Sequence, residues 1–412
     1  MRSLFISYNG ALEPLLQSQG IPYLMELSKK GINIQLLSFE KSEYLSQKKE
    51  VTILKKKLSG YGIDWHILRY HKKPSLLATL LDIFLGTLFS IYLVITKKIE
   101  VIHCRSYIPA VMGLVLKKIL RVKFIFDMRG LMADEFVDGG NWGKNSFNYK
   151  VVKSLEKKFL LSADAIVVLT ERICKVIKTF SYLKNKTLNM KIIPCCVDLQ
   201  KFRHQRLLQD SYKLKHLKGK TILIYVGSIG TWYLLKEMVD FFTVFKKRFS
   251  NTHFIILTHS HRQQVDEVIT DKGLEKKDFS IIRAPSLEVA SYISLARVGI
   301  SFIKPVFSKQ ASSPTKLAEY LACGLPVIIN SGIGDTEDLV KHNKVGTVIS
   351  EFNEANYMRA IDELVELTKY KVDLEGRCRK VAENYFSLIE GAKKYFDIYQ
   401  DLKTYEGPKQ ST

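Results

Sequence analysis

Cysteine is scarce in this sequence and is not arranged to bind a metal ion or to form a disulfide framework. The 412 residues include six cysteines, which form neither a CxxC pair nor a zinc-binding spacing. Most of them stand in apolar segments, so we expect reduced, buried thiols in a cytoplasmic protein. This pattern argues against a small disulfide-stabilised secreted scaffold and against a structural zinc site.

Acidic residues are also in short supply. Basic residues outnumber them by 63 to 41, which gives a formal net charge of +22. The excess is concentrated in residues 1–200, where 31 Lys and Arg stand against 16 Asp and Glu. Such an excess favours a phosphorylated substrate, an anionic membrane or nucleic acid. The lysine clusters lack interleaved aromatic residues and any recognisable nucleic-acid-binding module, so we expect no nucleic-acid partner.

Only one long hydrophobic run is present, at 74–95, and it is just long enough to span a bilayer. Thr79, Asp82, Gly86 and Ser90 recur along it at helical spacing and form a narrow polar stripe. Because a carboxylate is costly at membrane depth, we prefer a crossover helix packed on a sheet to a true span. A third interpretation keeps the packed helix but rests its apolar face, flanked by lysines, on an anionic leaflet.

Shorter apolar runs alternate with helix-forming segments along the rest of the chain. The opening, MRSLFISYNGALEP, has an apolar run too short for a secretory signal and predicts a first strand. The alternation predicts an α/β protein with doubly wound parallel sheets. The strand-like runs are SLFISY, INIQLLSF, WHILRY, EVIHCR, VKFIFDMR, AIVVLT and KIIPCCV in the first half, and TILIYVGSIG, HFIILTHS, FSIIRAP, VGISFIKP, LPVIINS and GTVIS in the second.

The chain length and a hydrophobic fraction of 46% suit two domains of ordinary size. Apolar runs stop and then resume in the polar stretch 199–220. We therefore place a first domain at 1–200 and a second at 201–385.

The stretch SSPTKLAEYLACGLPVI, at 312–328, predicts a phosphate-binding turn, a helix and a buried strand in succession. Ser313 can cap the helix, Pro314 suits its first position, and the N–H groups there favour an anion. Lys316 adds a cation, and Glu319 can accept hydrogen bonds from ribose hydroxyls. A capped helix and strand without a ligand is the alternative interpretation.

This stretch resembles the nucleotide-sugar signature of family 4 glycosyltransferases, which are retaining enzymes of the two-domain GT-B fold. In that signature a Glu, seven residues and a second Glu precede a small residue, Gly, any residue and Pro-Val. Glu319 matches the second Glu, whereas the first falls on Ala311. VIHCRSY, FIFDMRGLMADE, SADAIVVLT, IPCCVDLQKF and YVGSIGTWY occur in the family's order. The final FSLIEGAKKYFDIYQDL, within about 386–412, resembles the family's closing helix, which returns to the first domain.

The resemblance implies that the first domain holds the acceptor and the second the nucleotide sugar. Backbone at Gly227 to Gly230 can approach a diphosphate. Relatives place an Arg and a Lys where Ser228 and Tyr233 stand, so we expect Lys316, and next Lys304, to neutralise the diphosphate. Trp232 and Tyr233 bound the donor pocket or cover the sheet edge. The predicted donor-binding residues are Gly227, Ser228, Gly230, Arg283, Ser312, Ser313, Pro314, Thr315, Gly332 and Gly334.

On the acceptor side, polar residues end two consecutive strands, in HCRSY and DMRGLMADE. Arg105 and Arg129 can bind a phosphate, and a buried Asp127–Arg129 ion pair is an equal alternative. Arg129 stands roughly where relatives have a histidine, and His103 lies in the preceding strand. We expect Lys316, Glu319, Arg129 and Asp127 to act in catalysis, and Asn9, Gly10, Arg105, Asp134 and Glu135 to face the acceptor.

The resemblance thus implies a retaining hexosyltransferase that moves a sugar from a nucleotide diphosphate sugar to a cell-surface glycan precursor, lipid-linked or free. No cofactor or metal is expected, and no metal-binding DxD is present. We expect a cytoplasmic protein, in one version at the inner face of the plasma membrane. Two rivals stay open. One is a nucleotide-sugar epimerase of the same fold. The other is a catalytically silent, membrane-associated partner subunit, an interpretation motivated by Ala311 and by the missing Arg–Lys pair.

Overall fold

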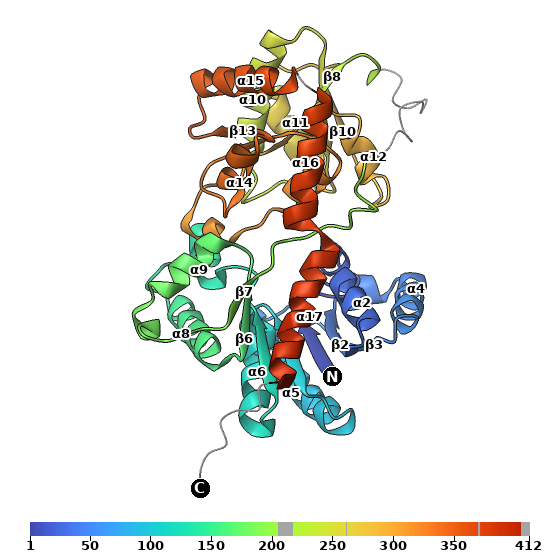
Figure 1. The fold of residues 1–412 in the computed structure, drawn as a ribbon, viewed down its shortest axis with the longest axis vertical. Helices are drawn as coiled ribbons and strands as arrows, with labels where there is room; N and C mark the ends of the chain where they lie inside the picture. Colours follow the sequence, from blue (N-terminus) through green and yellow to red (C-terminus); the bar gives the residue numbers. More distant parts are fainter. Residues whose placement is uncertain (205–216, 261, 370, 405–412) are drawn as a thin grey trace. The chain divides into compact units, whose positions relative to one another are not determined.

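The computed structural model describes residues 1–204, 217–260, 262–369 and 371–404. The chain divides into two compact units (Figure 1): unit 1 is Met1–Pro194 with Leu388–Thr412, and unit 2 is Cys195–Ser387. Each unit contains one parallel sheet covered by helices, which confirms the predicted pair of doubly wound sheets. Residues 205–216 of the predicted boundary stretch and 405–412 of the predicted closing helix lie outside the described residues.

Unit 1 is built on a seven-stranded sheet with the order β3-β2-β1-β4-β5-β6-β7, and its paired strands are parallel. The strands are β1 (Arg2–Ser7), β2 (Asn33–Glu40), β3 (Asp64–Arg69), β4 (Val101–Arg105), β5 (Lys123–Asp127), β6 (Ala165–Val168) and β7 (Met190–Ile192). All seven overlap the predicted runs, although β1, β2, β3 and β7 each extend one residue beyond them. The strand order reverses between β1 and β4, which places a topological switch point beside their carboxyl ends.

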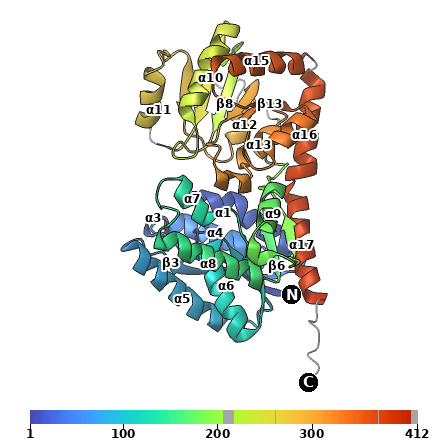
Figure 2. The same cartoon turned by 90° about the vertical axis from the view of Figure 1, so that its left-hand side faces the viewer.

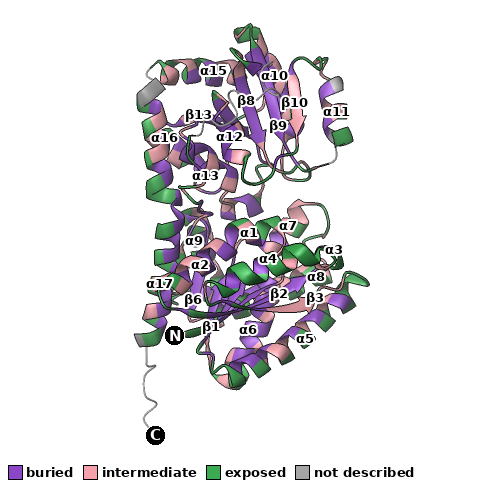
Figure 3. Cartoon of the chain, turned by 90° about the vertical axis from the view of Figure 1, so that its right-hand side faces the viewer, coloured by how far each residue is buried: buried purple, intermediate pink, exposed green. Residues whose placement is uncertain are grey.

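Helices cover both faces of this sheet (Figure 3), with α2 and α4 on one face and α5 and α6 on the other. Helix α8 packs against α6 and β5. The helices of unit 1 are α1 (Pro14–Gln19), α2 (Ile21–Lys29), α3 (Ser42–Leu45), α4 (Lys48–Ser59), α5 (Ser75–Thr96), α6 (Tyr107–Leu120), α7 (Met132–Asp138), α8 (Phe147–Ser162), α9 (Glu171–Lys178), the short 3₁₀ helix η1 (Ser181–Leu183) and α17 (Leu388–Thr404). Helix α17 packs beside α2, and the hydroxyl of its Tyr399 lies 2.9 Å from both Ser3 Oγ and His103 Nδ1. The predicted return of the last helix to the first domain is therefore confirmed.

Unit 2 has a six-stranded parallel sheet with the order β10-β9-β8-β11-β12-β13. Its strands are β8 (Thr221–Val226), β9 (Thr252–Leu257), β10 (Phe279–Ile282), β11 (Val298–Ser301), β12 (Val327–Asn330) and β13 (Gly346–Ile349). All lie within the predicted runs except β9, which begins one residue earlier. Its helices are α10 (Leu235–Arg248), α11 (Arg262–Thr270), α12 (Val289–Ile293), η3 (Phe307–Ala311), α13 (Thr315–Ala322), α14 (Thr336–Asn343), α15 (Glu354–Thr368) and α16 (Lys371–Phe386).

The core of unit 2 lies on both faces of its sheet because consecutive residues of β8 point in opposite directions. Ile222 and Ile224 join one buried cluster with helices α13 and α16, while Leu223 and Tyr225 join another with α10 and α15. Burial on both faces explains why these strands are continuous apolar runs in the sequence.

Helix α5 is the crossover from β3 to β4, and it packs against α6 and β1 (Figure 2). Of the predicted polar stripe, Asp82, Gly86 and Ser90 are buried. Within the described part of the chain, α5 is the one helix long and apolar enough to cross a membrane by length and composition, and 33% of its most apolar window is buried.

Candidate active site

In unit 2, the loop after β8 touches the start of α13. The Val226 N–H donates to the Tyr320 hydroxyl at 2.8 Å and thereby ties the end of β8 to α13. Gly227 has φ +141°, and a Cβ there would lie 3.0 Å from Cε and Nζ of Lys316. Glycine is therefore required both by the backbone conformation and by the close approach of the lysine.

The ammonium of Lys316 is buried against two aromatic rings. Its Nζ lies 3.3 Å from the ring centre of Tyr233 and 5.0 Å from that of Tyr225. The residue is 6% exposed, and Nζ has no hydrogen-bond partner among the described residues. Burial lowers the pKa of Lys316 to about 7, although the carboxylate of Glu319 opposes this shift. The site thus holds a cation without an anionic partner in direct contact.

Glu319 lies one helical turn after Lys316 and is partly exposed. Burial raises the pKa of Glu319 against the opposing pull of Lys316 and Lys201. Its carboxylate makes no hydrogen bond with the described residues, so it is free to accept ligand hydroxyls. Lys201 Nζ donates to Ser286 Oγ at 2.6 Å, in the loop after β10. The sequence did not predict Lys201, because the only signal there is a charged residue near the end of IPCCVDLQKF.

The predicted cap of α13 is wrong. The helix begins at Thr315 with Pro314 as its N-cap, and no side chain caps it. Instead, the Ser313 hydroxyl accepts a hydrogen bond from the Cys195 N–H at 3.1 Å, and the Ser312 N–H donates to the Lys309 carbonyl oxygen at 3.1 Å. The first turn of α13 therefore keeps N–H groups that no side chain satisfies, and such groups favour an anion.

A second lysine, Lys309 in η3, connects two loops at this edge of the sheet. It is 7% exposed, and its Nζ lies 3.8 Å from the ring centre of Trp232. Its carbonyl oxygen accepts from the Gly334 N–H at 2.9 Å. Gly332 and Gly334 both have positive φ, +86° and +42°. Trp232 and Tyr233 thus each support a lysine ammonium, and nothing in the sequence pattern distinguished Lys309.

The remaining predicted donor residues follow the same edge of the sheet. The Ser228 carbonyl oxygen accepts from the Tyr225 hydroxyl at 2.5 Å. Gly230 has φ +157°, and a Cβ added there would meet no described atom within 4 Å. Arg283 and Lys304 are exposed. Arg283 follows β10, which β9 separates from β8 in the sheet.

In unit 1, Asp127 ends β5 and is surrounded by basic groups. Its Oδ2 lies 3.5 Å from Arg105 Nη1 and 3.7 Å from His103 Nε2, and its Oδ1 lies 3.7 Å from Arg129 Nη1. The Tyr395 hydroxyl of α17 donates to Oδ2 at 3.0 Å. Burial opposes ionisation, but the Arg129 guanidinium, followed by His103 and Arg105, holds the pKa of Asp127 at about 2. Asp127 is therefore an ionised, buried partner of the arginines.

His103 lies beneath this cluster and is buried. Burial lowers the pKa of His103, although Asp127 opposes the shift, so the imidazole is neutral near pH 7. Arg129 adopts a left-handed conformation with φ +59°. The predicted Asp127–Arg129 pair is present, and sequence reasoning missed Tyr395 because it comes from the far end of the chain.

A cavity of about 260 Å³ opens at the carboxyl ends of β1, β4 and β5. It is lined by Asn9, Arg105, Arg129 and Glu135, four of the predicted residues, and by Tyr8. It combines two guanidinium groups, a carboxylate, an amide and a phenol, which together can bind a polyhydroxylated or anionic ligand.

Two predicted acceptor residues lie outside this cavity lining. Gly10 makes room for Glu40, since a Cβ there would clash with Glu40 Oε2. Asp134 is buried and turns to α8, where Lys153 Nζ lies 3.2 Å from its Oδ2 and the Tyr149 hydroxyl donates to its Oδ1 at 3.1 Å. Within the described part of the chain, no three His, Cys, Asp or Glu residues are grouped to hold a metal ion.

Two family models match the chain, one in each half. Residues 24–201 match Glycosyltransferase Family 4, and residues 209–383 match Glycosyl transferases group 1. No curated protein matches the sequence.

The chain is similar in fold to several solved structures. Sucrose-phosphate synthase from Thermosynechococcus elongatus is 14% identical with a TM-score of 0.73, over 98% of this chain and 99% of that one. A glycosyltransferase from Rickettsia africae is 15% identical with a TM-score of 0.72, over the same shares. Anabaena HepE in complex with UDP and glucose is 12% identical with a TM-score of 0.70, over 97% and 100%. With both halves matched and the GT-B fold present, this chain belongs to the family 4, group 1 glycosyltransferases, which retain the anomeric configuration of the transferred sugar.

Proposed function

We propose that this glycosyltransferase moves a hexose from a uridine diphosphate sugar to a cell-surface glycan precursor that is linked to a lipid. Its dependence on a nucleotide sugar follows from its family. The uracil base is suggested by HepE, whose structures contain UDP and UDP-glucose. The observation that supports the donor site most directly is the buried ammonium of Lys316, held by Tyr233 and adjacent to Gly227 without an acceptor.

The donor half of the reaction is mainly electrostatic. Negative charge builds on the diphosphate as its bond to the sugar breaks, and Lys316 with the uncapped first turn of α13 would stabilise that charge. Glu319 would accept hydrogen bonds from the ribose hydroxyls. Lys309, which the family pattern does not include, is a second cation at the same sheet edge and offsets the absence of the Arg–Lys pair.

The acceptor would bind in the cavity of unit 1. Arg105 and Arg129 can bind a phosphate or several hydroxyls. Glu135 is partly exposed in the cavity lining, and its carboxylate can accept a hydrogen bond from the attacking hydroxyl. Asp127 has a different role in this proposal. It is buried and ionised, and it fixes the two guanidinium groups in the cavity wall.

Thermal-shift measurements with UDP, GDP, ADP and their sugar conjugates test the donor half. A ligand that binds only the folded protein raises its melting temperature. We expect a shift with the UDP series that Lys316→Ala and Glu319→Ala both abolish. Lys341→Ala is the matched control, because Lys341 forms an exposed i,i+4 pair with Glu337 and lies outside the site.

The outcomes separate the alternatives clearly. A shift confined to the GDP or ADP series would replace uridine by that base. If Lys316→Ala still shows the thermal shift, the diphosphate binds elsewhere in the protein. If no nucleotide shifts the melting temperature of folded protein, the proposed donor site is wrong. Transfer of labelled sugar to extracted lipid-linked glycans, and not to free sugars, tests the acceptor half.

A further inference from the structure

Helix α5 presents an apolar face that no described residue covers. Leu77 is 65% exposed and Phe84 is 59% exposed. The exposed residues of this face are Leu76, Leu77, Leu80, Leu81, Phe84, Leu85, Leu88, Tyr92 and Ile95. They run the length of the 22-residue helix, which lies at the periphery of unit 1 in Figure 3. A contiguous apolar surface of this length marks an interaction site rather than ordinary surface variation.

The opposite face of α5 carries the polar residues and is buried. Asp82 Oδ2 accepts hydrogen bonds from the Tyr8 hydroxyl at 2.8 Å and from the His71 N–H at 3.1 Å. Gly86 packs so closely that an added Cβ would lie 2.7 Å from Phe39 and 2.9 Å from Met112. The inner face of α5 thus combines polar groups with Ala78, Leu93 and Val94, while its outer face is apolar, unlike that of a usual surface helix. Burial in unit 1 cannot explain the apolar face.

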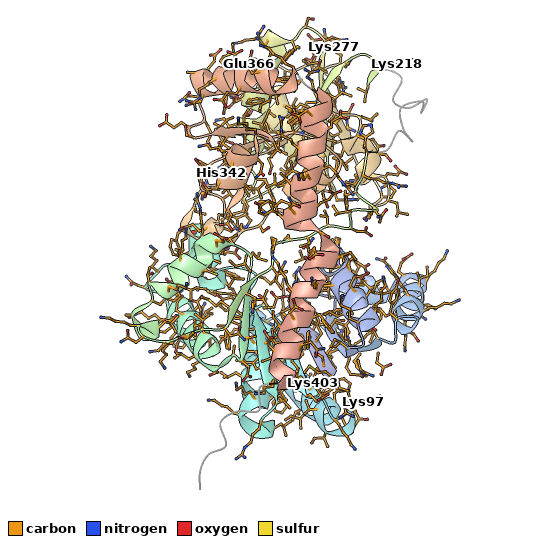
Figure 4. All side chains as sticks on the ribbon, in the orientation of Figure 1. Lys97, Lys218, Lys277, His342, Glu366 and Lys403 are labelled. Carbon is orange, nitrogen blue, oxygen red and sulfur yellow. The ribbon has the colours of Figure 1, made fainter. Side chains whose placement is uncertain are left out.

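Basic residues stand at both ends of this face. Lys72 and Lys73 precede α5, while Lys97 and Lys98 follow it, and all four are exposed. Figure 4 labels Lys97 at the end of the helix. The acidic groups nearby are Asp64, which lies 3.7 Å from Lys97, and Glu100, which pairs with Arg2. Asp82, the single acidic residue of α5, is buried. An apolar strip between lysines complements a bilayer that carries negative headgroups.

We infer that the exposed face of α5 lies in the interface of an anionic lipid bilayer, parallel to its plane. A true span is disfavoured because it would surround α5 with lipid and remove Asp82 from Tyr8 and His71. A second copy packed symmetrically on this face would bring like lysine clusters toward each other. A lipid surface would bury the apolar strip and place the lysines beside negatively charged headgroups.

Tyr8 joins the same helix to the acceptor cavity. Tyr8 lines the cavity and donates its hydroxyl to Asp82 of α5. A bilayer that holds α5 therefore holds one wall of the cavity near its surface, where a lipid-linked acceptor is presented. This consequence rests on the proposed function, whereas the lipid-binding surface itself does not.

Flotation of the full chain with lipid vesicles tests the surface. The probes are vesicles of phosphatidylcholine alone and of phosphatidylcholine with about one quarter phosphatidylglycerol. We expect about tenfold stronger binding to the anionic vesicles, and weaker binding in high salt. Leu77→Glu combined with Phe84→Glu should reduce binding by about tenfold or more. Lys72→Gln combined with Lys73→Gln should remove most of the preference for anionic lipid.

Phe147→Glu is the matched control, since Phe147 is 77% exposed in the same unit but lies on α8. It should bind vesicles as the unchanged protein does. A nucleotide-induced thermal shift that is equal in all variants would show that unit 2 is intact, so a failure of lipid binding is distinguishable from a failure of the donor site.

Three results would overturn the inference. Vesicle binding unaffected by the Leu77 and Phe84 changes would assign lipid binding to another surface. A dimer in solution that Phe84→Glu dissociates, with no vesicle binding, would identify a second copy as the occupant. Protein that leaves the vesicles only in detergent, and never in high salt or alkaline wash, would indicate that α5 spans the bilayer.

Discussion

The ammonium of Lys316 lies 3.3 Å from the ring centre of Tyr233. An aromatic ring attracts a cation without neutralising it. The tyrosine therefore holds Lys316 in place and leaves its charge available to a diphosphate. The same burial removes water from the ammonium and lowers its pKa to about 7.

Donor binding should be coupled to proton uptake by Lys316. Its pKa is about 7 in the ligand-free protein, and a bound diphosphate raises that pKa. Near pH 8 the lysine therefore gains a proton on binding, and UDP affinity should fall as the pH rises above about 7. Calorimetric titration with UDP in two buffers of different ionisation enthalpy measures the uptake. Lys316→Gln should show none, and an unchanged uptake in that variant would assign the proton to another group.

Lys316→Met should stabilise the ligand-free protein. The folded-state pKa is lowered from 10.5 to about 7, so the penalty for burying the charge is fully present below pH about 7 and disappears as the pH rises toward 10.5. Removing it should raise the free energy of unfolding by about 2 to 4 kcal/mol near neutral pH, and by much less near pH 10. Melting temperatures at several pH values measure this. A destabilised variant near pH 7 would show that Lys316 is better solvated than its burial implies.

Gly227→Ala and Gly230→Ala form a matched pair. Both glycines have positive φ, so each change should cost about 1 kcal/mol or more from backbone strain. Only at Gly227 would the new methyl group press on Cε and Nζ of Lys316, 3.0 Å away. We therefore expect Gly227→Ala to weaken UDP binding at least tenfold more than Gly230→Ala does. Equal losses of affinity would mean that the Gly227–Lys316 contact does not position the ammonium.

Asp127→Asn should destabilise unit 1 strongly. The change removes the carboxylate that balances Arg105 and Arg129, and uncompensated charge of this kind costs about 3 to 5 kcal/mol. The pKa of Asp127 is lowered to about 2, so its contribution is present above the ordinary value of 3.8 and is lost as the pH falls toward 2. Melting curves from neutral to acidic pH should show this loss in the unchanged protein only. Asp397→Asn, at an exposed position of α17, is the control. Its melting curves at neutral and at acidic pH should match those of the unchanged protein.

Apolar runs were sufficient to locate the thirteen strands of the described part of the chain, since strands buried on both faces leave a continuous pattern. They were also sufficient to place the Lys316 helix at the carboxyl edge of the second sheet. The hydroxyl of Ser313 could not be assigned, because Cys195 competes for it from 118 residues away. Lys309 and Lys201 carry no motif and become part of the site through loops that only the fold brings together. The inward orientation of Asp82 depends on Tyr8 and His71, which local periodicity does not reveal.

Tyr395→Phe tests whether α17 completes the cluster around Asp127. The hydroxyl of Tyr395 donates to Asp127 Oδ2 at 3.0 Å although the two residues are 268 positions apart. Its removal should cost about 1 to 2 kcal/mol, as expected for a buried hydrogen bond to a charged group. Because the hydroxyl acts through Asp127, the double variant with Asp127→Asn should be less destabilised than the sum of the two single changes, by about 1 kcal/mol. Melting curves of the four proteins give this coupling. Strict additivity would mean that α17 is held by its apolar contacts alone and that the ionised state of Asp127 does not depend on the last helix.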